Sequence, residues 1–141
     1  MPEAPRAEDV VLETFAAVEA RDAGRLLELY HDDIEFLWPE PLSYAGTFRG
    51  AQVVDMGARF ASAWDPVQPT DDWRGMHPRV VGASDGDVVV RYVQRGELPT
   101  GERIDAEVLG LYEVRDGRLA RAQMFYFDPD GVERFLTRAR S

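Results

Sequence analysis

Apolar residues follow a helical period in several parts of the chain. Near its start, Val11, Phe15 and Val18 recur at i, i+4 and i+7, so one face of a helix is apolar while glutamates occupy the opposite face. Asp22 and Asp128 precede later apolar stripes and are suitable N-cap residues. Periods and caps together predict helices over residues 7–20, 23–30, 51–64 and 130–138.

The segment from residue 76 to residue 128 has the pattern of a meander of long strands. Turn signals at 84–87, 98–101 and 115–117 supply Gly or Asp where a tight reversal needs them, and Asp116-Gly117 predicts a hairpin. A twisted sheet of long strands must bury one face, so we expect helices to cover one side of a mostly antiparallel sheet. The prediction is a single α+β domain spanning residues 1–141, with strands over 76–83, 87–96, 102–115 and 118–127 after a shorter one that begins at Ile34.

Charge and composition narrow the classes of partner. Acidic residues outnumber basic ones by 26 to 16, and the net charge of −10 argues against nucleic acid and against anionic membranes. Cysteine is absent, and with only His31 and His77 available we expect no protein-built metal site and no cofactor. No signal-like start is visible, so a cytoplasmic location is the expectation. Small molecules or protein partners remain.

Several segments together carry a family resemblance. The chain resembles the limonene-epoxide hydrolases and, more broadly, the nuclear transport factor 2-like superfamily, which includes ketosteroid isomerases and SnoaL-like polyketide cyclases. The N-terminal half is similar to the opening of that superfamily at Ala20-Arg21-Asp22, at residues 30–34 and at residues 46–50. In the C-terminal half the resemblance is carried by Leu98-Pro99-Thr100-Gly101-Glu102, Val108-Leu109-Gly110-Leu111-Tyr112, Asp116-Gly117-Arg118 and Tyr126-Phe127-Asp128.

The resemblance implies a cone-shaped fold. A curved, mostly antiparallel sheet would wrap three N-terminal helices around a deep apolar pocket, with a short C-terminal helix. Strand parity on the family pattern then points Val89, Arg91 and Val93 inward, and on the later strands Ala106, Val108, Gly110, Tyr112, Ala122, Met124 and Tyr126. The expected ligand-binding residues are Tyr30, Trp38, Tyr44, Phe60, Trp64, Val93, Val108 and Met124.

The catalytic carboxylates of the resembled enzymes are replaced here. Epoxide hydrolysis in that family uses an Asp-Arg-Asp set, whose Arg corresponds to Arg91 and whose carboxylates correspond to Val93 and Met124. The base of the ketosteroid isomerases falls at Trp38, and their protonated Asp falls at Gly110. Neither mechanism keeps its acid or base in this chain.

Five residues remain as catalytic candidates, each with a structural alternative. Arg91 on an inward strand position would anchor a substrate anion, or else pair with a core carboxylate or extend to the pocket rim. Glu40 and His77 would move a proton, or else be a solvated loop residue and a strand-edge residue. Tyr112 and Tyr126 would donate to a developing oxyanion, or else only pack.

These residues predict a cofactor-independent pocket enzyme. It would act on an apolar polyketide- or terpenoid-like molecule by proton transfer, in an isomerisation, cyclisation or dehydration. The alternatives are a non-catalytic protein that binds or templates a small molecule, and a divergent epoxide hydrolase. A homodimer through the outer sheet face is expected from the resemblance, and Leu109 and Leu111 on that face fit it.

Overall fold

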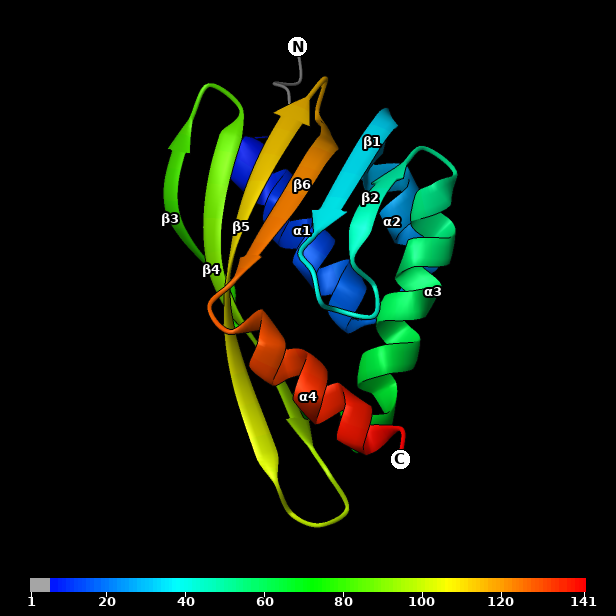
Figure 1. Ribbon diagram of the computed structural model, residues 1–141. Helices are drawn as coiled ribbons and strands as arrows, with labels where there is room; N and C mark the ends of the chain where they lie inside the picture. The colour runs from blue at the N-terminus through cyan, green and yellow to red at the C-terminus, as the bar shows by residue number, and fades with distance from the viewer. Residues whose placement is uncertain (1–5) are drawn as a thin grey trace.

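One six-stranded sheet organises the chain, and the computed structural model describes it within residues 6–141 (Figure 1). The strand order is β2-β1-β6-β5-β4-β3, and all neighbours are antiparallel except β1 and β6, which run parallel. The α+β prediction is confirmed. The strands are β1 Tyr30–Trp38, β2 Gly46–Arg49, β3 Arg79–Ser84, β4 Asp87–Glu97, β5 Arg103–Arg115 and β6 Arg118–Tyr126.

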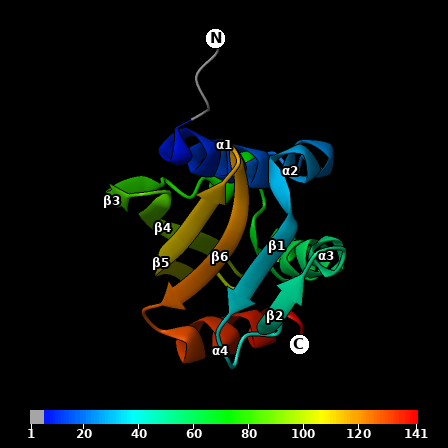
Figure 2. The same ribbon diagram turned by 90° about the horizontal axis from the view of Figure 1, so that it is seen from above.

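Helices α2 and α4 begin where the sequence places an N-cap residue. Asp22 accepts a hydrogen bond from the backbone N–H of Arg25 at 3.0 Å, and Asp128 accepts one from Gly131 at 3.0 Å, so both predicted N-caps are confirmed. Figure 1 shows α4 crossing the lower part of the sheet, and Figure 2 shows α1 and α2 together along one side of it. The helices are α1 Ala7–Glu19, α2 Ala23–Leu29, α3 Gln52–Trp64 and α4 Pro129–Ala139, with 3₁₀ turns at Asp65–Val67 and Asp71–Arg74. Across the described residues, no helix is both long enough and apolar enough to cross a bilayer.

The hairpins follow the turn chemistry of the sequence. Asp116 and Gly117 have φ values of 55° and 72°, which is the left-handed pair that a two-residue hairpin turn requires. The predicted Asp-Gly hairpin between β5 and β6 is therefore confirmed. The short strand β2 was not predicted, because its four residues lie between a loop rich in proline and aromatic residues and the start of α3.

The inner face of the sheet packs against α1. The ring of Phe15 meets Tyr92 edge-on with centroids 4.9 Å apart, and meets Tyr112 at 5.8 Å. The inward parity predicted for β5 and β6 is confirmed, since all of its members are buried: Ala106, Val108, Gly110, Tyr112, Ala122, Met124 and Tyr126.

The parity predicted for β4 is wrong by one residue. Val89, Arg91 and Val93 lie on the outer face of the sheet. Residues opposite each other on neighbouring strands share a face, and Tyr92 lies opposite the inward Val108. The inner face of β4 is therefore made by Val88, Val90, Tyr92 and Gln94, all of them buried.

Candidate functional site

A cavity of about 400 Å³ lies between the inner face of the sheet and helices α1, α2 and α3. Aromatic rings form much of its wall: Trp38 and Phe60 stack with centroids 5.6 Å apart, and Phe36 stacks on Trp38 at 6.1 Å. An enclosure of this size and composition suits an apolar small molecule. The remaining wall is largely aliphatic, from Val18, Leu26, Leu27, Val53, Val54, Met56, Ala58, Ala61, Met76 and Met124.

Three tyrosines belong to the wall, of which Tyr92 and Tyr112 are buried and Tyr30 is half-buried. Burial raises the pKa of Tyr30 and of Tyr112 far above that of a free phenol, and it raises the pKa of Tyr92 as well. All three hydroxyls are therefore neutral near pH 7. A neutral phenol donates or accepts a hydrogen bond, but it does not act as an anionic base.

A buried hydrogen-bond chain ends at the cavity wall. The indole Nε1 of Trp64 donates to the hydroxyl of Tyr44 at 2.9 Å, and that oxygen lies 2.8 Å from the hydroxyl of Tyr126. Tyr126 donates to Oε1 of Gln94 at 2.6 Å. Of these four residues only Gln94 lines the cavity, because Trp64 and Tyr44 are fully enclosed and Tyr126 lies behind the wall.

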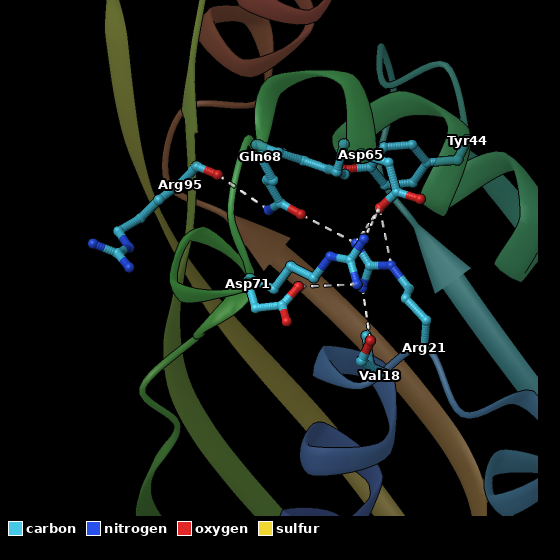
Figure 3. A network of polar contacts seen from close by, with 9 residues as sticks. Val18, Arg21, Tyr44, Asp65, Gln68, Asp71 and Arg95 are labelled. Atoms are coloured by element: carbon cyan, nitrogen blue, oxygen red, sulfur yellow. Dashed lines mark hydrogen bonds and ion pairs between the residues drawn. The ribbon is translucent and has the colours of Figure 1, made fainter.

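One cationic side chain belongs to the cavity wall, that of Arg21, which follows the C-cap of α1. Its guanidinium donates to the carbonyl oxygen of Val18 at 2.7 Å, to Oδ1 of Asp65 at 2.8 Å and to Oε1 of Gln68 at 3.1 Å (Figure 3). It also lies over the ring of Phe60, 5.8 Å from the centroid. The charge of Arg21 is thus neutralised by Asp65 from outside the cavity and fixed in position.

Arg91, the leading candidate from the sequence, does not reach the cavity. Its side chain is 42% exposed on the outer face, where it pairs with Glu107 and lies over the ring of Phe127. Val93 shares that outer face. The expectation that residue 91 is a buried pocket cation is therefore wrong, and the reason is the β4 parity.

Glu40 and His77 also lie away from the cavity. Both are exposed, Glu40 in the loop after β1 and His77 before β3, and neither belongs to the wall. A proton shuttle by either residue inside the cavity is not compatible with these positions.

The other predicted residues divide into wall and core. Five lie in the wall, where their roles remain predictions: Tyr30, Trp38, Phe60, Tyr112 and Met124. Four predicted site residues lie in the core behind it, where they hold the wall rather than meet a ligand: Tyr44, Trp64, Val108 and Tyr126.

Sequence reasoning missed four polar residues of the wall: Thr14, Arg21, Tyr92 and Gln94. Tyr92 and Gln94 share the strand parity of Val88 and Val90, so a correct parity for β4 would have identified them. Arg21 belongs to a segment that resembled the superfamily, but nothing in its spacing placed it at the cavity.

The wall offers hydrogen bonds and shape but no acid–base pair. Among the described residues that line the cavity there is no carboxylate and no imidazole. Its polar groups are phenols, the hydroxyl of Thr14, the amide of Gln94 and the paired guanidinium of Arg21. Such a set orients a ligand and polarises it without removing a proton.

The chain is similar to one family model and to many solved structures. Residues 11–122 match the model described as SnoaL-like domain. Bal32a, from a soil-derived mobile gene cassette, superposes with a TM-score of 0.76 at 19% identity, over 96% of this chain and 99% of its own. TerC, co-crystallised with polyporic acid, gives 0.74 at 19% identity, over 96% of this chain and 98% of its own. IdmH, a candidate polyketide cyclase from Streptomyces antibioticus, gives 0.74 at 15% identity, over 94% and 99%. No curated protein matches the chain.

Proposed function

Because the chain belongs to the SnoaL-like domain family, within the nuclear transport factor 2-like superfamily, we propose that it binds one apolar, polyketide- or terpenoid-like molecule in the concave cavity and promotes its isomerisation or cyclisation. The observation that carries the proposal is the aromatic and aliphatic wall around about 400 Å³. A relative of the same fold is described as a candidate polyketide cyclase, and another was crystallised with polyporic acid, which agrees with a ligand of this class.

The proposed mechanism is templating. Stacked rings such as Trp38 and Phe60 hold a flexible, unsaturated ligand in one folded conformation, which removes much of the entropic barrier to ring closure. Neutral phenols, Tyr30 and Tyr112, donate to oxygen atoms of the ligand as charge develops on them. The wall supplies no base, so the ligand must be acidic enough to lose a proton to water, and water must return a proton to the product.

A second candidate function is binding without turnover. It is favoured by the same absence of a carboxylate or imidazole from the cavity wall described above. That absence also removes the support for a divergent epoxide hydrolase, which needs an acid and a base beside the epoxide.

A fluorescence titration tests the cavity directly. The neutral dye N-phenyl-1-naphthylamine should bind the wild type in a saturable manner. Ala61→Trp, which fills the cavity from α3, should abolish that binding. Ala16→Trp is the matched control, because Ala16 is an exposed residue of α1 outside the wall. Equal dye binding by both variants would contradict the proposed site.

Turnover is tested with linear poly-β-ketone chains and mass spectrometry. Cyclisation gives a product with a new retention time and unchanged mass, and dehydration gives the loss of one water. Binding of the same chains without either product would support the second candidate.

We also propose a homodimer through the outer face of the sheet. Phe125 and Phe127 are 49% and 56% exposed there, and Leu109 and Leu111 are half-buried beside them. Phe125→Glu should convert a dimeric sedimentation profile to a monomeric one. A wild type that sediments as a monomer would refute the proposal.

A further inference from the structure

The side-chain amide of Gln94 is oriented by a hydrogen bond from Tyr126 to its oxygen, and this orientation determines which hydrogen-bonding group it presents to a ligand in the cavity. We propose that Gln94 presents its Nε2 hydrogens to the cavity, so that the ligand is recognised through a hydrogen-bond acceptor, such as a ketone, quinone or enolate oxygen. The inference rests on the proposed function, because it names the chemistry of the ligand in that same cavity.

The direction of the buried chain begins at Trp64. An indole N–H only donates, so the hydroxyl oxygen of Tyr44 must accept from it. The hydroxyl hydrogen of Tyr44 is then free to donate, and the hydroxyl of Tyr126 at 2.8 Å is its acceptor. Tyr126 in turn donates to Gln94. The indole N–H and the two hydroxyl hydrogens then each have one acceptor, and the chain ends at the amide oxygen of Gln94.

The opposite orientation of the amide leaves a hydroxyl without an acceptor. If Nε2 of Gln94 donated to Tyr126, the two hydroxyl hydrogens of Tyr126 and Tyr44 would have only one hydrogen bond left to make, the one between the two hydroxyls. Either the hydroxyl hydrogen of Tyr44 or that of Tyr126 would have no partner. Tyr44 is fully buried and Tyr126 is 8% exposed, so neither hydrogen would reach bulk water. An unpaired buried hydroxyl is costly, and the observed direction avoids it.

The free end of the amide therefore belongs to the ligand. Gln94 is 2% exposed and lines the cavity, and within residues 6–141 its Nε2 has no protein acceptor. The neighbouring inward residue of β4 is Tyr92, whose raised pKa keeps it a neutral phenol. An acceptor oxygen of the ligand beside Gln94 satisfies a donor that otherwise has only water.

A matched pair of ligands tests the orientation. Fluorene and 9-fluorenone have nearly the same shape and differ by one carbonyl oxygen. The wild type should bind 9-fluorenone about threefold to tenfold more tightly than fluorene, measured by displacement of N-phenyl-1-naphthylamine. The carbonyl stretch of bound 9-fluorenone should move to lower wavenumber than in hexane, because it accepts a hydrogen bond.

Three variants test whether the buried hydrogen-bond chain causes the affinity ratio and the shift of the carbonyl stretch. Gln94→Met keeps a similar volume without the donor, and should remove both the affinity ratio and the shift of the carbonyl stretch. Tyr126→Phe releases the amide oxygen and should reduce both, which identifies Tyr126 as a positioning residue that acts through Gln94. Gln123→Met is the control, because Gln123 lies on the outer face and accepts from Arg121. It should change neither readout.

The outcomes separate this inference from the proposed function. Equal affinities for the two ligands with an unshifted carbonyl stretch would overturn the orientation and leave cavity binding intact. Failure of both ligands and of the dye to bind would overturn the proposed function instead. In that case NMR of the ligand-free protein tests the orientation of the amide. The side-chain amide hydrogens of Gln94 should exchange rapidly with water. Strong protection of those hydrogens, which would place them within the buried chain, would overturn the inference without any variant.

Discussion

Gly110 lies beneath the ring of Tyr112, and a methyl group at residue 110 tests how the cavity wall is shaped. A Cβ there would stand 2.5 Å from Cε2 and from the hydroxyl oxygen of Tyr112, whereas ordinary contacts begin at 3.4 Å. The ring must therefore move by roughly 1 Å, and overpacking of this kind costs about 1–3 kcal/mol. Replacing a strand glycine by alanine recovers about 0.5–1 kcal/mol of chain entropy. Gly110→Ala should lower the free energy of unfolding by about 1 kcal/mol, within a range of about 0–2.5 kcal/mol.

Displacement of the Tyr112 ring should also weaken ligand binding. Tyr112 is part of the cavity wall, so Gly110→Ala should weaken binding of N-phenyl-1-naphthylamine. Urea denaturation and dye titration measure the two effects. Gly57→Ala is the matched control: Gly57 also lines the cavity, but nothing lies within 4 Å of its Cβ position. In the interior of α3 this control should raise the free energy of unfolding by about 0.5–1 kcal/mol. If both substitutions were stabilising, the close packing of Tyr112 on residue 110 would be refuted.

Other perturbations have separate expectations. Burial raises the pKa of Tyr112, so the contribution of this tyrosine to folding stability is complete below about pH 10, the pKa in the unfolded chain, and is lost as pH rises further. Urea denaturation across pH 7 to 12 measures this loss. A free energy of unfolding that does not fall above pH 10 would contradict the burial of Tyr112. Dye binding should be constant between about pH 6 and pH 9, because no group of the described cavity wall changes charge there, and a bell-shaped profile would point to a missed acid or base. Arg21→Ala should cost about 1–2 kcal/mol of unfolding free energy, because Asp65 and Gln68 lose the guanidinium donor and the carbonyl of Val18 keeps only the backbone N–H of residue 21. Arg91→Ala on the outer face should cost less than about 1 kcal/mol and leave dye binding unchanged. Asp128→Ala should lower the melting temperature through the loss of the α4 cap, worth about 0.5–2 kcal/mol, and an unchanged melting temperature would mean that water replaces the cap.

Turn residues and caps made most of the fold predictable. Asp22 and Asp128 fix where helices begin, and Asp116-Gly117 fixes a hairpin, because each acts through its own backbone and needs no knowledge of distant contacts. The short strand β2 lacks such a local signal, and it pairs with β1, which lies earlier in the chain.

The candidate site was less predictable, and β4 shows why. Three consecutive valines, residues 88–90, make both faces of the strand apolar, so apolarity alone does not fix its parity. The charged residues of the strand indicate its parity. All of them lie at positions of one parity and face outward: Asp87, Arg91, Arg95 and Glu97. Placing Arg91 by family analogy overrode that signal. The role of Gln94 was beyond the sequence, because its partners Tyr126, Tyr44 and Trp64 come from three distant segments.

The parallel pairing of β1 with β6 sets an order of events during synthesis on the ribosome. β1 is made early, but one of its two neighbours in the sheet is the last strand of the chain (Figure 1). Until residues 118–126 leave the exit tunnel, one edge of β1 has no hydrogen-bonding partner, and the cavity lacks the part of its wall that β6 supplies. A nascent chain that ends at Arg115 should therefore remain sensitive to protease, and resistance should arise only after the final strand is released.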